Sequence, residues 1–502
     1  MSVLEWLAEY PRQDKIIISN MHRSYTIDDL FVKCHELETY LKEKNIEHVA
    51  LCADNSFDWL VVDLVCQRNK KCLVPLPTWF TEEQINDSLS ETATTHLFLD
   101  SHAAVRLSSR KELMDVPGTD LKILKLAGAT DPCVPVGTGK ITFTSGSTAA
   151  PKGVCLSHQQ QVDQALALCD AVSIKNPRHL SLLPLSTLLE NVAGLYAPLL
   201  AEGEVVVPSL KELGYVGSAL HEPARMLEII RRVQPDTMIL VPELLRLLIG
   251  AIEAGWEAPT SLKFIAVGGA HVSRVLLEMA SQANLPVYEG YGISECCSVV
   301  TLNTFSNKKI GSCGIPLKNQ KISIEDGQIC VTGNVMLGYL GLPESWSLQK
   351  FMTGDVGFIS EEGFINLQGR ITNQIISSFG RNISPEWIEA RLLGHQAISE
   401  CVVIGDARPF CVALLTKKDI CVSDEELGTW ISSINKTLPD YAQIRHWRII
   451  TKSFKDYQGL LTANGKLRRE AINLRFNTEI ESLYANKESL KVNISGEESA
   501  LI

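Results

Sequence analysis

Helical and strand-like patterns of hydrophobic positions alternate along the first part of the chain. Between residues 25 and 44 apolar side chains recur at helical spacing, and Thr26 or Asp28 can cap the start of that helix. The pattern then predicts a strand at 48–53, a helix at 57–68 and a strand at 71–75, and it continues through 204–208, 223–233, 237–241, 242–254 and 262–267. Such alternation predicts a layered α/β domain.

The pattern changes near residues 363–370, after a strand-like segment at 327–332 and a glycine-rich run. A smaller α+β unit is predicted beyond it, with a helix at 385–393, strands at 400–405 and 411–416, a helix at 424–437 and a strand at 444–450. Roughly 130 residues remain there, enough for an independent core. We therefore expect a large N-terminal domain of residues 1–370 and a small C-terminal domain of residues 371–502, with a frayed polar tail from 486.

Composition narrows the class of protein. The chain has 502 residues, of which 45% are hydrophobic and 21% charged, as in ordinary globular proteins of two or three domains. Its 47 basic and 58 acidic side chains give a net charge of −11, which argues against nucleic acid as a partner. The sequence shows no targeting segment and no apolar stretch of the ~18 residues that a transmembrane helix needs. Its 14 cysteines form no paired Cys-x-x-Cys motifs, so we expect reduced thiols in a cytoplasmic protein.

The most distinctive chemistry lies in residues 141–153, Ile-Thr-Phe-Thr-Ser-Gly-Ser-Thr-Ala-Ala-Pro-Lys-Gly. Hydroxyl groups, backbone N–H groups freed by glycine, and the charge of Lys152 together suit a polyphosphate. A strand at 140–144 precedes this loop, and residues 157–160 form a capping-box pattern that opens a helix reaching about 172. A Walker P-loop is excluded because Lys152 follows a proline instead of a glycine. The alternative is a surface loop rich in Ser and Thr.

A second cluster lies in residues 288–295, Tyr-Glu-Gly-Tyr-Gly-Ile-Ser-Glu. Gly290 and Gly292 allow a bend of the backbone that bulkier residues resist. The ring of Tyr291 can stack on a base, and the carboxylate of Glu295 can hold Mg²⁺ beside phosphates. The alternative is a strand-to-loop turn with a buried tyrosine.

Three shorter segments each have an ordinary structural interpretation when taken alone. Gly268-Gly269-Ala270 ends a predicted strand and can be a simple turn. Thr353-Gly354-Asp355 is interpreted as a turn with an exposed carboxylate, followed by Gly369-Arg370. Lys466 follows Asn-Gly, where a lysine is normally a solvated turn residue.

In this order, the segments resemble the signature motifs of the adenylate-forming superfamily, which includes acyl-CoA synthetases, peptide-synthetase adenylation domains and luciferases. The loop is similar to Thr-Ser-Gly-Ser/Thr-Thr-Gly-x-Pro-Lys-Gly, with Ala149 in place of a glycine. The second cluster resembles Tyr-Gly-x-Thr-Glu, with Ser294 in place of threonine. The resemblance covers nearly the whole chain and implies a large N-terminal domain of layered α/β subdomains with a small mobile α+β domain after it.

The resemblance also implies roles for the site residues. Tyr291 would pack on adenine, Glu295 would be the magnesium ligand, and Asp355 would accept both ribose hydroxyls. Lys466 would bridge the substrate carboxylate and the α-phosphate, and Arg370 would lie near ribose and phosphate. The implied catalytic residues are Thr144, Lys152, Glu295 and Lys466. The implied nucleotide-binding residues are Thr144, Ser145, Gly146, Ser147, Thr148, Lys152, Gly268, Gly269, Ala270, Glu289, Gly290, Tyr291, Gly292, Ser294, Asp355, Arg370 and Lys466.

The reaction implied is ATP-dependent activation of a carboxylic acid to an acyl-adenylate with release of pyrophosphate, followed by transfer to the thiol of coenzyme A. ATP, Mg²⁺ and CoA are therefore expected, with a small-molecule acid as substrate. One alternative acceptor is the phosphopantetheine thiol of an acyl carrier protein. Another alternative is a nucleotide-binding protein with impaired catalysis, which the departures at Ala149, Thr187 and Thr372 would support.

The segment 183–196 bears on the identity of the acid. It resembles the Leu-Pro-Leu-Ser-His-x-x-Glu segment of long-chain acyl-CoA synthetases, with Thr187 in place of histidine. It contains no aspartate that could hold a substrate ammonium. A small apolar lining is expected from Val192, Ala193, Gly194 and Leu195, although an ordinary apolar helix fits equally well. We expect a fatty or other apolar acid.

Overall fold

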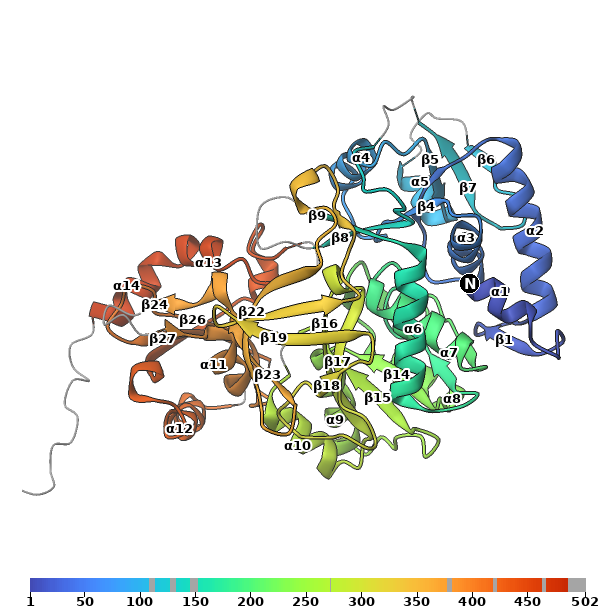
Figure 1. The fold of residues 1–502 in the computed structure, drawn as a ribbon. Coiled ribbons are helices and arrows are strands. Elements are labelled where there is room, and N and C mark those ends of the chain that lie inside the picture. The colour runs from blue at the N-terminus through green and yellow to red at the C-terminus, as the bar shows by residue number, and fades with distance from the viewer. Residues whose placement is uncertain are drawn as a thin grey trace, which may run out of the picture. The chain divides into compact units, whose positions relative to one another are not determined.

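The computed structural model describes residues 1–107, 113–126, 132–144, 152–270, 272–376, 382–418, 422–462 and 466–485. The chain divides into two compact units, residues 1–367 and 368–502 (Figure 1). The division falls within β23 (Ile365–Arg370), whose last residue is the boundary expected from the sequence. The position of the domain boundary, residue 370, stays a prediction. The predicted fold class, a large α/β unit followed by a smaller α+β unit, is confirmed.

A long mixed sheet crosses the first unit. Its central strands are parallel and its outer strands antiparallel. Strands such as β14 are buried on both faces, which explains their continuous apolar sequences. In spatial order the sheet contains β18 (Ile315–Pro316), β17 (Ser298–Leu302), β16 (Val287–Ile293), β15 (Phe264–Val267), β14 (Thr237–Leu240), β10 (Arg178–Leu180), β11 (Glu204–Val206), β1 (Ile16–Ser19) and β2 (Ser24–Thr26).

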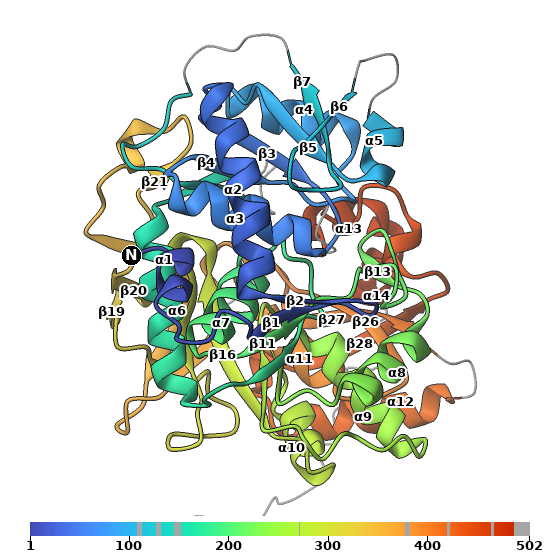
Figure 2. The ribbon, with the colours of Figure 1, turned by 90° about the vertical axis from the view of Figure 1, so that its right-hand side faces the viewer.

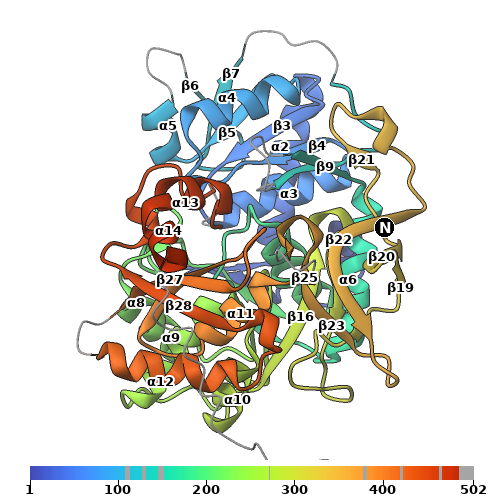
Figure 3. The same ribbon diagram turned by 90° about the vertical axis from the view of Figure 1, so that its left-hand side faces the viewer.

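A second mixed sheet of the first unit carries the segment rich in hydroxyl groups. Its β8 and β9 are antiparallel, with Thr144 opposite Lys152, and β21 pairs with the other edge of β9 (Figure 3). Residues 145–151, which connect β8 to β9, lie outside the described residues. In spatial order this sheet contains β21 (Gly338–Tyr339), β9 (Lys152–Leu156), β8 (Lys140–Thr144), β4 (Cys72–Pro75), β3 (His48–Cys52), β5 (His96–Leu99), β7 (Lys122–Lys125) and β6 (Leu113–Asp115).

A third sheet follows β18 in the chain and corrects one prediction. It contains β19 (Gln320–Glu325), β20 (Gln328–Gly333), β22 (Lys350–Ile359) and β23. The turn predicted at residues 353–355 is wrong, because these residues lie inside β22. The register shifts there and Gly354 adopts a φ of 72°, so a bulge accommodates the glycine without ending the strand. Asp355 is consequently 7% exposed instead of solvated.

Helices cover these sheets. In the first unit α3 packs against β3 and β4, and α2 packs on α3 (Figure 2). The long sheet is contacted by α6 at β17, by α9 at β14 and by α10 at β16. The helices of this unit are α1 (Val3–Ala8), α2 (Ile27–Glu43), α3 (Phe57–Arg68), α4 (Glu82–Glu91), α5 (Ser101–Leu107), α6 (His158–Val172), the π-helix η1 (Glu190–Tyr196), α7 (Ala197–Leu200), α8 (Pro223–Val233), α9 (Pro242–Glu253) and α10 (Arg274–Gln282), with short 3₁₀ turns η2 (Ser294–Cys296) and η3 (Pro343–Ser345) and the hairpin of β12 (Tyr215–Val216) and β13 (Ala219–Leu220).

Local capping explains where two predicted helices begin. At α6 the Ser157 hydroxyl accepts a hydrogen bond from the backbone N–H of Gln160, whose side chain accepts one from the Ser157 N–H, so the predicted capping box is confirmed. At α2 the cap is Thr26, paired in the same way with Asp29. Asp28 therefore belongs to the first turn of α2. No described helix is both long and apolar enough to cross a membrane.

The second unit is the predicted α+β arrangement. Its β26 pairs antiparallel with β27, and β27 pairs parallel with β28. Its elements are β24 (Ile375–Ile376), β25 (Asn382–Ile383), α11 (Pro385–Leu392), β26 (Ile398–Ile404), β27 (Cys411–Lys417), α12 (Asp424–Asn435), β28 (Ile444–Ile450), α13 (Arg469–Arg475) and α14 (Asn477–Ala485), with the 3₁₀ turns η4 (Ile371–Asn373), η5 (Asp440–Ala442) and η6 (Phe454–Asp456). The tail from residue 486, expected to fray, lies outside the described residues.

Candidate active site

Lys152 stands at the start of β9, where its side chain is exposed. The pairing of β21 with β9 sets Tyr339 opposite Val154, and the N–H of Leu340 donates to the carbonyl of Gly153 at 2.8 Å. The ammonium Nζ of Lys152 consequently lies 5.1 Å from the centroid of the Tyr339 ring. A cation at this distance is attracted by the electron-rich face of the ring.

Glu295 joins this pair from a third segment. It lies in η2, directly after β16, and its carboxylate Oε1 accepts a hydrogen bond of 2.8 Å from the hydroxyl of Tyr339. Its carbonyl accepts a further hydrogen bond from the N–H of Met336 at 2.7 Å. The structure thus brings two predicted site residues, Lys152 and Glu295, together through Tyr339. Tyr339 could not be identified from the sequence, because only the pairing of two distant strands, β21 and β9, places it there.

The predicted glycine segments lie side by side at the ends of β15 and β16. A Cβ atom at Gly268 would come within 2.9 Å of the Gly290 carbonyl oxygen, so this close approach requires glycine. A Cβ atom at Gly292 would lie 1.8 Å from the carbonyl oxygen of Ser298 in β17. Gly269 and Ala270, just beyond β15, are exposed. They are therefore accessible to a nucleotide, which the resemblance implies that they bind.

Tyr291 and Asp355 form a buried pair. The hydroxyl of Tyr291 donates to Asp355 Oδ2 at 2.6 Å, and the N–H of Asp355 donates to the hydroxyl of Thr353 at 3.0 Å. Burial, and then the Asp355 carboxylate, raise the pKa of Tyr291 well above its usual value, so the hydroxyl keeps its proton. The ring packs in a cluster with Val300 and Ile329 and is 7% exposed. The structure joins the residues predicted for adenine and ribose, while stacking by Tyr291 stays a prediction.

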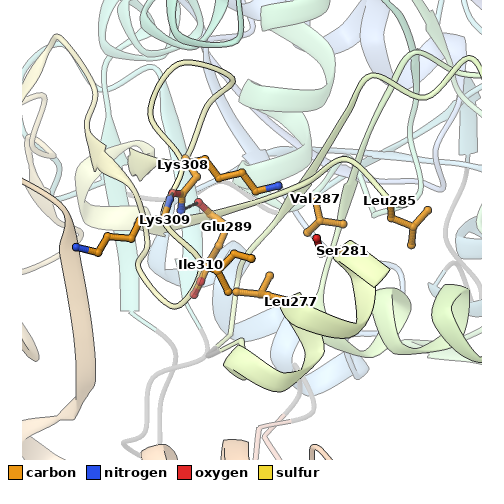
Figure 4. A pocket seen from close by; sticks show the side chains of 9 residues that line it. Leu277, Ser281, Leu285, Val287, Glu289, Lys308, Lys309 and Ile310 are labelled. Carbon is orange, nitrogen blue, oxygen red and sulfur yellow. Dashed lines mark hydrogen bonds between the residues drawn. The ribbon is translucent and has the colours of Figure 1, made fainter. Parts of the chain in front are cut away.

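Glu289 behaves differently from the other predicted nucleotide-binding residues. Its carboxylate lies in a small pocket, whose lining includes none of the other predicted site residues (Figure 4). Oε1 accepts a weak hydrogen bond of 3.5 Å from the thiol of Cys313, and within the described residues Oε2 has no hydrogen-bond partner. Burial raises the pKa of Glu289 to about 8. The role of Glu289 in nucleotide binding stays a prediction. The pocket is lined by Leu277, Ser281, Leu285, Val287, Glu289, Asn303, Lys308, Lys309 and Ile310.

We expect Glu289→Gln to change how stability depends on pH. The folded chain holds a proton on Glu289 up to about pH 8, whereas the unfolded chain loses it near the ordinary value of 4.5. The free energy of unfolding therefore falls as pH rises between these two values. The Glu289→Gln variant lacks this loss. From pH 5 to pH 8 its free energy of unfolding should therefore rise relative to that of the wild type by more than about 1 kcal/mol. Urea unfolding across that range measures the difference. Glu228→Gln, on the exposed face of α8, is the control, and parallel profiles for all three proteins would contradict the assignment.

The remaining predicted residues are not all placed. Ser145, Gly146, Ser147 and Thr148 lie outside the described residues. Lys466 and Arg370 belong to the second unit, where both are exposed. The N–H of Lys466 donates to the Thr462 hydroxyl at 3.0 Å, and Arg370 ends β23. Ser294 begins η2. The roles of Lys466 and Arg370 in the site stay predictions.

An apolar pocket of the first unit includes one of the residues expected to line the acid site. It has about 620 Å³ of empty space, part of it open to solvent. Of the four residues expected to line the acid site, Ala193 lines this pocket, whereas Val192, Gly194 and Leu195 are buried and do not. These four consecutive residues point in different directions around the π-helix η1, so they do not share one face. The role of the other three in holding the acid stays a prediction. The pocket is lined by Leu168, Cys169, Val172, Ile174, Pro177, His179, Leu189, Ala193, Ala197, Pro198, Ala201, Thr237, Met238, Ile239, Phe264, Ala266, Val299 and Leu302.

A buried polar pair borders this apolar pocket. His179 Nε2 lies 3.2 Å from Glu190 Oε1, and its Nδ1 lies 2.9 Å from the hydroxyl of Thr237. A Cβ atom at Gly194 would come within 2.5 Å of Glu190 Oε1, so glycine leaves the room that the pair needs. His179 and Thr237 give one wall of the pocket polar atoms.

Comparison with known proteins extends these observations to the whole chain. A family described as AMP-binding enzyme matches residues 4–340, and its C-terminal domain family matches residues 372–488. A long-chain-fatty-acid–CoA ligase of Mycobacterium bovis is 26% identical, with 88% of each chain covered. A 2-succinylbenzoate–CoA ligase of Staphylococcus aureus is 24% identical over 93% of this chain and 99% of that protein.

Solved structures share the fold. The anthranilate CoA ligase AuaEII in complex with anthranoyl-AMP has a TM-score of 0.78 at 17% identity, over 96% of this chain and 98% of that one. The o-succinylbenzoate CoA synthetase of Bacillus subtilis in complex with ATP and magnesium has a TM-score of 0.73 at 23% identity, over 93% of this chain and 98% of that one.

Proposed function

Because this chain belongs to the AMP-binding enzyme family, we propose that it activates a carboxylic acid with ATP and transfers the acyl group to the thiol of coenzyme A. The observation that carries the proposal is the meeting of Lys152 and Glu295 at Tyr339, next to the glycine segment that ends β16. A cation and a carboxylate at the same place suit an anionic nucleotide with its Mg²⁺.

The first half-reaction joins two anions that repel each other, the acid and the α-phosphate of ATP. Lys152 supplies a positive charge on the exposed start of β9. Glu295 fits a magnesium ion because its carboxylate is a hard oxygen donor, is partly exposed, and has one oxygen oriented by Tyr339. Bound Mg²⁺ would screen the phosphate charges. These groups favour attack of the acid oxygen on the α-phosphorus, where negative charge concentrates; the bond from the α-phosphorus to the bridging oxygen breaks and pyrophosphate leaves.

The nucleoside would be held by the first unit. Asp355 offers one carboxylate to two ribose hydroxyls, and Tyr291 fixes that carboxylate by its hydrogen bond of 2.6 Å. The exposed backbone of Gly269 and Ala270 would approach adenine. We propose that Lys466 and Arg370, from the second unit, neutralise the carboxylate and phosphate charges during the reaction.

The second half-reaction needs no covalent bond to the enzyme. The thiol sulfur of coenzyme A forms a bond to the acyl carbon, the carbon–oxygen bond to the phosphate breaks, and AMP leaves while the thiol proton passes to solvent. The cysteines are not required as nucleophiles. Burial raises the pKa of thiols such as Cys297 to about 12, which keeps them protonated and unreactive.

The acid is proposed to carry an apolar tail. The apolar pocket has a wall made mainly of alkyl side chains, as small-molecule sites do. An alkyl or aryl group gains free energy by leaving water for such a surface. The wall also carries the polar atoms of His179 and Thr237, so an acid with a polar group within its tail would fit as well as one with a plain alkyl chain.

A panel of acids tests the proposal. Pyrophosphate release from ATP is measured with short, long-chain and aromatic acids, and mass spectrometry detects the acyl-AMP and the CoA thioester. We expect release that depends on the acid and is highest with apolar acids. A parallel reaction with an acyl carrier protein in place of coenzyme A identifies the acceptor. Pyrophosphate release from none of the acids, in protein that binds ATP, would refute the proposed activity.

Ala193→Phe tests the assignment of the pocket. The larger ring would fill space that Ala193 leaves open, so KM for long apolar acids should rise at least about tenfold while the shortest active acid is affected less. The control is Val105→Phe, on the exposed face of α5, which should leave both KM values unchanged. Equal KM values for long acids in Ala193→Phe and the wild type would place the acid elsewhere.

A further inference from the structure

We propose that Tyr339 is a positioning residue that holds Glu295 in the orientation needed to bind Mg²⁺ and holds Lys152 beside it. This inference deepens the proposed function and depends on it for the role of Glu295. Tyr339 contacts both residues with different parts of one side chain. Its hydroxyl donates to Glu295 Oε1 at 2.8 Å, and its ring lies 5.1 Å from Lys152 Nζ.

The backbone of Tyr339 is itself fixed on both sides. Its N–H donates to the hydroxyl of Ser345 at 2.8 Å, and its carbonyl accepts from the indole Nε1 of Trp346 at 2.9 Å. Its strand β21 is paired to β9, so Tyr339 is anchored to the strand that carries Lys152. Such anchoring fixes the backbone of Tyr339 before any ligand binds, and its side chain packs against the core of the first unit. The ring therefore acts as a preformed support for the two charged groups.

The two contacts differ in their chemistry. The hydroxyl proton satisfies one oxygen of the Glu295 carboxylate and orients the group, as hydrogen-bonded partners of metal ligands do. The face of the ring attracts the ammonium group of Lys152. Removal of the hydroxyl alone should therefore affect the metal and spare the lysine, whereas removal of the ring should affect both. This difference separates positioning from a general role in packing.

Two variants use this difference. Tyr339→Phe keeps the ring and loses the hydroxyl, and Tyr339→Leu loses both. ATP binding is measured by calorimetry without any acid, so that no turnover occurs, first with excess EDTA and then at increasing Mg²⁺. For Tyr339→Phe we expect the half-saturating Mg²⁺ concentration to rise about 10-fold or more, with ATP affinity in EDTA unchanged. For Tyr339→Leu we expect the half-saturating Mg²⁺ concentration to rise and the ATP affinity in EDTA to fall.

Two controls make the result specific. Tyr10→Phe loses a comparable hydrogen bond, from its hydroxyl to the carbonyl of Leu199 at 3.0 Å, and should leave the Mg²⁺ dependence unchanged. In a Glu295→Gln background, Tyr339→Phe should cause little further change, because the group that it orients has lost its charge. A similar Mg²⁺ requirement for Tyr339→Phe and the wild type, or a full additional effect in the Glu295→Gln background, would overturn the positioning role.

These outcomes are separable from the proposed function. Absence of acid-dependent pyrophosphate release in the wild type would refute acid activation, whereas the Mg²⁺ titration of ATP binding can still be measured. Conversely, normal acid activation together with an unchanged Mg²⁺ requirement in Tyr339→Phe refutes the positioning role alone. Thermal unfolding midpoints of Tyr339→Phe and Tyr10→Phe close to that of the wild type show that the measured shift arises in the site.

Discussion

Lys152→Met should lower kcat/KM for ATP in acid-dependent pyrophosphate release by about 10²–10³-fold, the usual cost of removing one group that stabilises charge in a transition state. Methionine has nearly the length of lysine but no charge, so it can lie over the Tyr339 ring without attracting phosphate. Because Lys152 is exposed at the start of β9, its replacement should change the free energy of unfolding by less than about 1 kcal/mol. Steady-state kinetics and urea unfolding measure the two quantities.

Lys263→Met is the control for this first variant. Lys263 is also exposed, and its ammonium lies 2.7 Å from Asp236 Oδ1. Loss of that surface ion pair should cost less than about 1 kcal/mol and leave the kinetics unchanged. Lys152→Met with full kcat/KM would contradict the role of Lys152. A strongly destabilised Lys152→Met protein would show that this lysine supports the fold instead of the chemistry.

The regular elements could be predicted where local signals bound them. The helix α3 spans the predicted residues because the Ser56 hydroxyl caps its start, and the strand β28 spans the predicted residues 444–450. The strand β22 could not be predicted, because Gly354 signals a turn when only its neighbours are considered. Pairing with β20 across a bulge overrides that signal. The π-helix η1 was hidden for a related reason, since its pattern of apolar residues fits an α-helix equally well.

The candidate site likewise contains features that the sequence predicts and features that only the structure shows. Motifs predicted Lys152, Glu295 and Asp355, and the structure adds what joins them to their surroundings, Tyr339 for the first two and Tyr291 for the third. Tyr339 has no local mark in the sequence, because its place arises from the pairing of β21 with β9. Tyr291 lies in a motif, but its hydrogen bond to Asp355 joins two different sheets and could not be predicted. The side chain of Glu289 shows the opposite case. It lies within a motif, yet strand geometry turns it into a pocket without other site residues.

Lys140 lies at the start of β8, at the end of the β8–β9 hairpin far from Lys152. We expect its replacement to destabilise the fold, whereas replacement of Lys152 should not. Lys140 is 1% exposed, and its ammonium lies 2.7 Å from Asp63 Oδ1. Asp63 Oδ2 also accepts hydrogen bonds from Asn191 at 2.8 Å and from Tyr196 at 2.7 Å. Lys140→Met should lower the free energy of unfolding by about 3–5 kcal/mol, because it leaves the Asp63 carboxylate buried without its cation. Scanning calorimetry, with the transition of residues 1–367 resolved, measures the loss.

A second substitution decides whether charge or shape causes this loss. Asp63→Asn removes the stranded charge and keeps most of the volume, so the double variant Asp63→Asn, Lys140→Met should recover at least half of the stability that Lys140→Met loses. Lys309→Met, which breaks the exposed pair with Glu362 and a contact with the Phe364 ring, should cost less than about 1 kcal/mol. Lys140→Met as stable as Lys309→Met would refute the buried ion network. A double variant no more stable than Lys140→Met would show that packing around the methionine, and not the unpaired carboxylate, sets the cost. Together these measurements distinguish the two lysines of one hairpin. Replacement of Lys152 should change kcat/KM for ATP, and replacement of Lys140 should change the free energy of unfolding.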